Sequence, residues 1–181
     1  MLKEIVIDYE SNKKDIDKWT TLKGEKKYIE LSTILRDINI EITWRKLDDL
    51  FRYDKRLLFN CFKYMSMFED FIRACLLNET NATFDDLKEK YFIKMMKKIV
   101  DDKANYTNYL DINILEKEYE NINEIRNNIC HNKLMLKIDN LRKKLFDFMM
   151  LLPDDYKENF RRTINDSIKG LELDDKVKII I

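Results

Sequence analysis

The feature of this sequence that most restricts its fold is the scarcity of residues that reverse a chain. Its 181 residues include two glycines and one proline. Sandwiches, barrels and doubly wound sheets need many tight turns, and those turns consume glycine and proline. Helices joined by short polar links need few of them. The sequence therefore predicts an all-α fold, with five or six helices in a single domain over residues 1–181.

Apolar residues at steps of three and four locate the helices. We expect one or two helices across 28–52, and further ones over 83–102 with Thr83 as N-cap, about 111–132, and 138–152, closed by Pro153. A last helix should start at Asp154 or Asp155 and stop at Gly170. The clearest helix covers 55–78, where one apolar stripe is formed by Leu58, Phe62, Met65, Ile72 and Leu76. The end segments EIVIDY and VKIII are rich in β-branched residues and predict short strand-like pieces.

Charge and cysteine content limit the possible partners. Lysine plus arginine and aspartate plus glutamate both number 34, so net charge provides no general attraction to nucleic acid. The three cysteines are widely spaced and form no CxxC motif, which favours reduced thiols in the cytoplasm. The acidic start MLKEIVIDYE does not resemble a secretory leader, and no apolar run is long enough to span a bilayer. We therefore expect a cytoplasmic protein that does not associate with membranes.

The only histidine lies in the segment NEIRNNICHNK, residues 123–133. On a helix centred on Ile122, Arg126 falls at the edge of the buried face, and Asn127 and His131 lie together on the polar face. Arginine and histidine suit phosphate binding and proton transfer. A histidine at a helix end without any role fits the spacing equally well.

Glu69 is the second unusual residue, because it lies close to the apolar stripe of 55–78. A partly buried carboxylate needs a cationic partner. Arg73, one turn later, would make Glu69 an ordinary residue at the rim of the core. Arg126, from the helix with the histidine, would make Glu69 a support for the candidate site. The sequence favours neither partner over the other.

Basic residues follow the histidine. Lys133, Lys137 and Lys143 are candidates for contacts with RNA phosphates, although lysines on a solvated helix face need no such role. The sequence has no Glu-x-x-His pair for a carboxylate di-metal site, no glycine-rich phosphate loop and no GxSxG motif. Cys130 points away from the adjacent His131 and is expected to be a small half-buried side chain. We expect neither a metal nor a cofactor.

The segment RNNICHNKLML resembles the signature of the HEPN (higher eukaryotes and prokaryotes nucleotide-binding) superfamily, in which an arginine precedes a histidine by a few residues. Arg126, Asn127 and His131 match it, and MFEDFIRACL resembles the Glu-x-x-x-Arg segment of the abortive-infection branch at Glu69 and Arg73. The resemblance implies an up-and-down helical bundle. Many members are metal-independent endoribonucleases, toxins or antiviral effectors that dimerise so that two motifs share one cleft. Lys133 stands where one toxin subgroup has a modified tyrosine, so the pattern of that subgroup is not met.

The sequence and the resemblance together predict an endoribonuclease that cleaves RNA by 2′-hydroxyl attack at a site shared between two protomers. Arg126, Asn127 and His131 would be catalytic, with Glu69 and Arg73 in support. RNA, a second copy of the chain and an antitoxin or regulatory protein are the expected partners. The alternatives are a non-catalytic HEPN-type module that binds nucleic acid or protein, and a plain helical bundle in which the motif is accidental.

Overall fold

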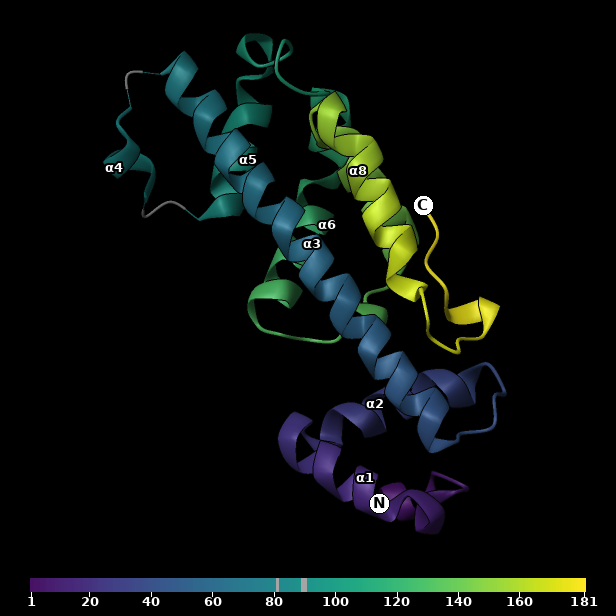
Figure 1. The fold of residues 1–181 in the computed structure, drawn as a ribbon. Coiled ribbons are helices and arrows are strands. Elements are labelled where there is room, and N and C mark those ends of the chain that lie inside the picture. The colour runs from purple at the N-terminus through teal and green to yellow at the C-terminus, as the bar shows by residue number, and fades with distance from the viewer. Residues whose placement is uncertain (81, 89–90) are drawn as a thin grey trace. The chain divides into compact units, whose positions relative to one another are not determined.

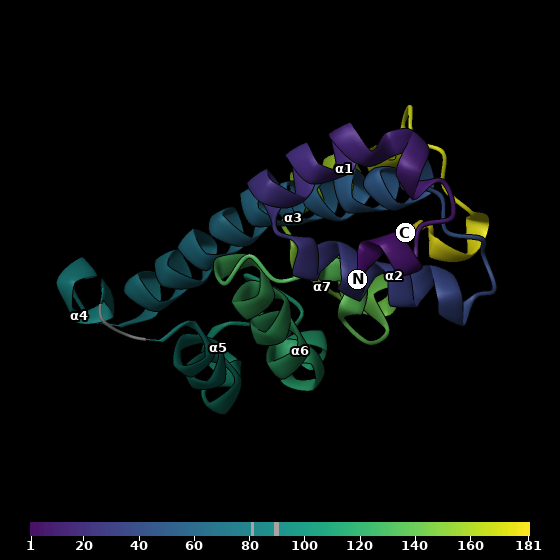
Figure 2. The same ribbon diagram turned by 90° about the horizontal axis from the view of Figure 1, so that it is seen from below.

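The computed structural model describes residues 1–80, 82–88 and 91–181 of the chain. Within these ranges the chain is helical and has no strand, which confirms the all-α prediction. Eight α-helices lie there, so the expected five or six were too few. They are labelled in Figures 1 and 2 and have these bounds: α1 (Tyr9–Lys23), α2 (Glu25–Asp37), α3 (Trp44–Glu79), α4 (Phe84–Lys88), α5 (Phe92–Asp101), α6 (Ile112–Cys130), α7 (Leu141–Leu151) and α8 (Asp154–Asn165).

The chain divides into two compact units. Unit 1 contains residues 1–57 and 167–178, and unit 2 contains residues 58–166 and 179–181. The long helix α3 contributes its first turns to unit 1 and its remaining turns to unit 2. The single domain expected from the sequence stays a prediction, because compactness alone does not say whether each unit folds independently. None of the helices in the described ranges combines the length and apolar character needed to cross a bilayer.

Unit 1 is built around an aromatic cluster. The Tyr28 ring stacks on Phe51 at 4.7 Å and lies 5.1 Å from Trp44, measured between ring centroids. The Tyr28 hydroxyl donates to the Asp48 carboxylate at 2.9 Å. Burial, together with the nearby Asp48 charge, raises the pKa of Tyr28 above its ordinary range. The phenol therefore stays protonated and keeps its donor role.

The strands expected at the two ends of the chain were wrong. The segments EIVIDY and VKIII contain no strand, and the short 3₁₀ helices Leu2–Glu4 and Asp175–Val177 overlap them only at Glu4 and Val177. Leu2, Val6 and Val177 are buried. Apolar residues at these ends are thus buried one or two at a time and do not form the alternating face of a strand.

The helices of unit 1 differ from the predicted ones for two reasons. Helix α1 was not expected, because its sequence is mostly polar and it buries only Ile16. Gly24 then separates α1 from α2 with a φ of 92°, which favours glycine. The regions expected at 28–52 and 55–78 are divided at a different point. Helix α2 ends at Asp37, and α3 runs unbroken from Trp44 because its sequence contains neither glycine nor proline.

The core of unit 2 joins the later part of α3 to α7 and α8. Phe68 of α3 meets Phe148 of α7 edge-on, and Phe148 meets Phe160 of α8 in the same way, with 5.4 Å between centroids in each pair. Phe62 lies outside this core and is 55% exposed, so its placement in the apolar stripe was wrong. It lies about 80° around the helix from the buried Ile72. The other four stripe residues are buried: Leu58, Met65, Ile72 and Leu76.

The remaining helices of unit 2 follow α3 in a consecutive arrangement. Helices α5 and α6 pack side by side (Figure 2), α6 also packs on α7, and α7 packs on α8. The segment expected at 83–102 is divided into α4 and α5, and residues 89 and 90 lie outside the described residues. Thr83 caps α4 as predicted, because its hydroxyl accepts from the Asp86 N–H while its own N–H donates to Asp86.

The boundary between α7 and α8 was placed almost correctly. Helix α7 ends at Leu151, just before Pro153. Pro153 itself occupies the N-cap position of α8, whereas we expected Asp154 or Asp155 there. Those two acids lie in the first turn, where carboxylates interact favourably with the helix dipole.

Candidate functional site

Helix α6 presents the histidine motif, and its start follows from the sequence. The Asp111 carboxylate accepts hydrogen bonds from the N–H groups of Asn113 and Ile114 at 3.0 and 3.1 Å. This N-cap satisfies two of the donors that a helix start leaves unpaired. The buried face comprises five residues: Ile112, Leu115, Ile122, Ile125 and Ile129.

The end of α6 explains why an asparagine follows the histidine. His131 is the C-cap, and Asn132 adopts the left-handed conformation with a φ of 49°. The Lys133 N–H donates to the Asn128 carbonyl at 2.9 Å, and the Asn132 N–H donates to the Ile129 carbonyl at 3.1 Å. This pair of bonds is a Schellman motif, whose left-handed position favours glycine or asparagine. Asn132 therefore ends the helix, and His131 is left exposed at its last turn.

Glu69 has both of the partners between which the sequence could not choose. Its Oε1 accepts a hydrogen bond from Nη2 of Arg73 at 2.6 Å, and its Oε2 lies 3.7 Å from Nε of Arg126. One carboxylate thus lies between two guanidinium groups, and the trio carries a net charge of +1. Arg73 also directs Nη1 to the sulfur of Met95, 3.6 Å away on α5.

One edge of the Arg126 side chain faces Glu69, and another part of it is exposed to solvent. Its Nε is buried and has no hydrogen-bond partner among the described residues, although the side chain as a whole is 33% exposed. The exposed atoms of Arg126 are therefore other than Nε. A guanidinium whose inner edge faces a carboxylate and whose remainder reaches solvent suits the binding of an anion.

Helix α6 runs antiparallel to the later part of α3. The hydroxyl of Tyr109, just before α6, donates to Glu79 at the end of α3 at 2.6 Å. Further along α6, Arg126 forms an ion pair with Glu69, which precedes Glu79 by ten residues in α3. His131 lies about 7.5 Å beyond Arg126 along the helix axis. The end of α6 therefore continues toward the α3 turns that carry Ser66 and Phe62.

The other motif residues are distributed between surface and interior. Asn127 is half-buried on α6. Lys133 and Lys137 are exposed in the segment between α6 and α7. Lys143, on α7, is exposed but is paired with two carboxylates, Glu118 at 3.1 Å and Asp147 at 2.6 Å. An RNA phosphate at Lys143 would have to compete with those two charges.

Ion pairs fix α6 against α7. Lys143 forms an ion pair with Glu118, and Lys144 forms one with Glu124, six residues later on α6. Burial opposes ionisation of Glu118, but hydrogen bonds from Asn121 and Lys143 outweigh it and lower the pKa of this carboxyl. These contacts orient the helix that carries Arg126, and the sequence alone did not indicate them.

The thiols differ in exposure. Cys130 is exposed beside His131, so the expected half-buried environment was wrong. Cys61 and Cys75 are buried in α3. Burial raises the pKa of Cys75 to about 11 and that of Cys61 beyond the ordinary range of a thiol. Neither buried thiol is therefore prepared for nucleophilic chemistry.

The hollows described in unit 2 are lined by other residues. One of about 570 Å³ lies where α6 and α8 begin, and its lining includes Tyr109, Asp111, Asp154 and Lys157. A smaller one, of about 300 Å³, lies between Phe71 on α3 and the start of α8. Neither hollow includes Arg126 or His131, and His131 is exposed at the surface of the chain.

Within the part of the chain that the structure describes, no three His, Cys, Asp or Glu residues form a group that could hold a metal ion. Comparisons with models of protein families, with curated proteins and with solved structures found no match to this chain.

Proposed function

We propose that this protein is a metal-independent endoribonuclease of the HEPN type, with an active site shared between two protomers. The observation that supports this best is the placement of the Glu69 carboxylate between Arg73 and Arg126. It holds a guanidinium at the edge of α6, and the same helix carries Asn127 and ends at the exposed His131.

The chemistry follows from what RNA itself provides. The 2′-oxygen of a ribose attacks the adjacent phosphorus and loses its proton, while the 5′-oxygen of the next nucleotide leaves and gains one. In this proposal His131 moves a proton, Arg126 stabilises the charge on the phosphorane, and Asn127 orients the hydroxyl or the imidazole. The products are a 2′,3′-cyclic phosphate and a 5′-hydroxyl.

The proposed reaction needs two copies of the chain. It has two proton transfers, and one chain supplies one imidazole. His131 and part of Arg126 are also exposed at the surface of the chain, where water would surround a bound phosphate. A second protomer would supply another Arg126 and His131 and would cover that surface. Activity should therefore fall when dilution separates the protomers.

The test is incubation of the purified protein with mixed cellular RNA in excess chelator. Wild type should cleave, His131→Ala should not, and Lys97→Ala, at an exposed lysine of α5, should cleave like wild type. End analysis of the fragments should find cyclic phosphates and 5′-hydroxyls. Strict dependence on Mg²⁺ or Mn²⁺, with 5′-phosphate products, would contradict the proposed mechanism.

A non-catalytic HEPN-type binding module is the second candidate. It is favoured by the exposure of His131 at a helix end and by the two carboxylates that already occupy Lys143. In that case wild type and His131→Ala would both bind RNA or a protein partner, and neither would cleave. Electrophoretic mobility shifts recorded beside the cleavage assay separate the two candidates.

A further inference from the structure

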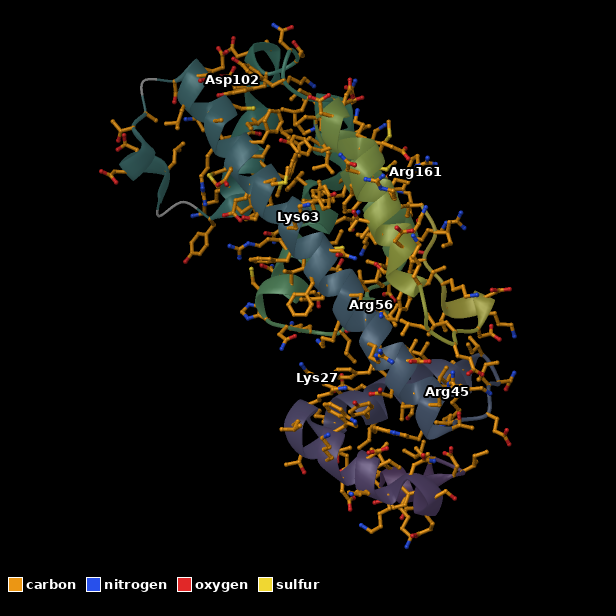
Figure 3. The ribbon with its side chains drawn as sticks, in the orientation of Figure 1. Lys27, Arg45, Arg56, Lys63, Asp102 and Arg161 are labelled. Carbon is orange, nitrogen blue, oxygen red and sulfur yellow. The ribbon has the colours of Figure 1, made fainter. Side chains whose placement is uncertain are left out.

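Two aromatic side chains of α3 are exposed within unit 2. Phe59 is 66% exposed and Phe62 is 55% exposed, and they are three residues apart on one side of the helix. Both belong to the part of α3 within unit 2, where Lys63 is labelled in Figure 3. Neighbouring large apolar groups on a rigid helix are typical of a surface that binds a partner.

Phe59 belongs to an exposed stripe along α3, and Phe62 lies at the side of this stripe. Its members recur at steps of three and four and therefore share one helix face. They are Phe59, Lys63, Ser66, Asp70 and Ala74. Within the described residues, Lys63 lies over the Tyr64 ring and forms no ion pair, and Asp70 forms none either. The stripe thus offers an apolar group, a small residue, a positive charge and a negative charge.

The order of these groups is self-complementary. When two copies of α3 meet antiparallel about a twofold axis, one register opposes Lys63 to Asp70 of the second copy. The same register opposes the large Phe59 to the small Ala74. Because the axis is twofold, each of these pairs occurs twice. Charge and size therefore select the same register.

We propose that this α3 stripe is the surface on which a second copy of the chain docks, with its α3 antiparallel. An RNA strand is a poorer occupant, because Asp70 within the stripe would repel its phosphates, whereas Asp70 attracts Lys63 of a second copy. The exposed parts of Phe59 and Phe62 amount to roughly 200 Å² per chain. A stable interface buries about 800 Å² per partner, so neighbouring residues must contribute and the dimer depends on concentration.

The docking has a consequence for the candidate site. The end of α6 continues toward the α3 turns with Ser66 and Phe62, and the proposed axis passes between Ser66 and Met67. The two copies of His131 would therefore lie near one shared interface, as the proposed ribonuclease requires. This link to catalysis rests on the proposed function, whereas the pairing of α3 helices does not.

Charge reversal tests the register without disturbing the core. Lys63→Glu and Asp70→Lys each turn two attractions into two repulsions and should raise the dimer dissociation constant about tenfold or more. The double variant K63E/D70K restores opposite charges and should return the constant close to that of wild type. Lys97→Glu, at an exposed lysine of α5, is the matched control and should change nothing. Sedimentation equilibrium over a concentration series measures the constants, and circular dichroism verifies folding.

Each possible result either supports or contradicts the proposed α3 interface. Weakening by both single variants together with rescue by the double variant supports the proposal. A monomeric wild type at every concentration, a dimer unaffected by the single variants, or a failure of the double variant to rescue would each overturn it. The measurement needs no RNA. A dimer that follows the predicted pattern but never cleaves RNA would therefore refute the nuclease and leave the α3 interface intact.

Discussion

The Glu69 carboxylate offers the sharpest test of how the candidate site is held. Glu69→Gln keeps the shape of the side chain and one acceptor oxygen, but it removes the charge between Arg73 and Arg126. The bond to Arg73 is short, at 2.6 Å, and the Glu69 side chain is only 20% exposed. The contact to Arg126 is longer, at 3.7 Å, and is not a hydrogen bond.

The magnitude follows from these two contacts. A hydrogen bond between charged groups contributes about 1.5–3 kcal/mol, and a neutral acceptor retains part of it. A longer, partly exposed ion pair contributes at most about 1 kcal/mol. We therefore expect Glu69→Gln to lower the free energy of unfolding by about 1–2 kcal/mol. For a chain of this length, the melting temperature should fall by about 2–8 °C.

The assay can separate the two units of the chain. Circular dichroism follows all helices, whereas the fluorescence of Trp19 and Trp44 reports unit 1 alone, since both tryptophans lie there. Glu69→Gln should lower the transition seen by circular dichroism and slow RNA cleavage. Glu116→Gln is the matched control, because Glu116 forms a more exposed pair with Lys103 at 3.6 Å. It should cost at most about 0.5 kcal/mol and leave cleavage unchanged.

The reasoning would be refuted by a Glu69→Gln protein that melts and cleaves like wild type. Glu69 would then be a rim residue without influence on Arg126. Double-mutant cycles give a finer reading, with Arg73→Gln and Arg126→Gln as the second substitutions. The coupling energy of Glu69 to Arg73 should exceed its coupling to Arg126, because only the former pair is hydrogen-bonded.

Substitutions at three other positions test further features of unit 2. The pKa of Glu118 is held below its ordinary 4.5 by Asn121 and Lys143, so its charge stabilises the fold above that pH and the gain is lost on acidification through the lower folded pKa. Acid titration of Glu118→Gln should accordingly show a shallower loss of stability than wild type, and an identical profile would contradict this. Asn132→Val should cost about 1–2 kcal/mol in urea unfolding, because a β-branched residue resists the left-handed conformation, and Asn132→Gly should cost less because glycine adopts that conformation readily. Tyr106→Phe should keep or raise the urea midpoint, since the buried hydroxyl has no hydrogen-bond partner among the described residues, and a loss above about 1 kcal/mol would reveal one.

The features predicted best from the sequence were those that depend on residues close together in the chain. Thr83 was predicted as an N-cap, and its hydroxyl accepts from the Asp86 N–H three residues later, so this contact depends only on residues close together in the chain. The scarcity of glycine and proline indicated the all-α class for a similar reason. Helix α1 escaped notice because it buries one residue, Ile16, and so lacks a periodic signal.

Contacts between distant segments could not be predicted in the same way. The wheel of α3 placed Glu69 near the core but could not choose between Arg73 and Arg126, because the second lies 57 positions away and its approach depends on how α6 packs. Phe62 was assigned to the core because it is apolar and close to the right spacing. Burial was decided by which side of α3 the neighbouring helices cover.

The rates at which the three cysteines react with an alkylating reagent can report local unfolding of the chain. Cys130 is exposed one residue before His131, so an alkylating reagent should modify it first and attach a probe at the candidate site. Cys61 and Cys75 lie fourteen residues apart within the buried face of α3. They can react only when the packing around their own turns separates, and burial also disfavours their thiolates. The ratio of their labelling rates would therefore show, without any added chromophore, which stretch of the long helix opens more often.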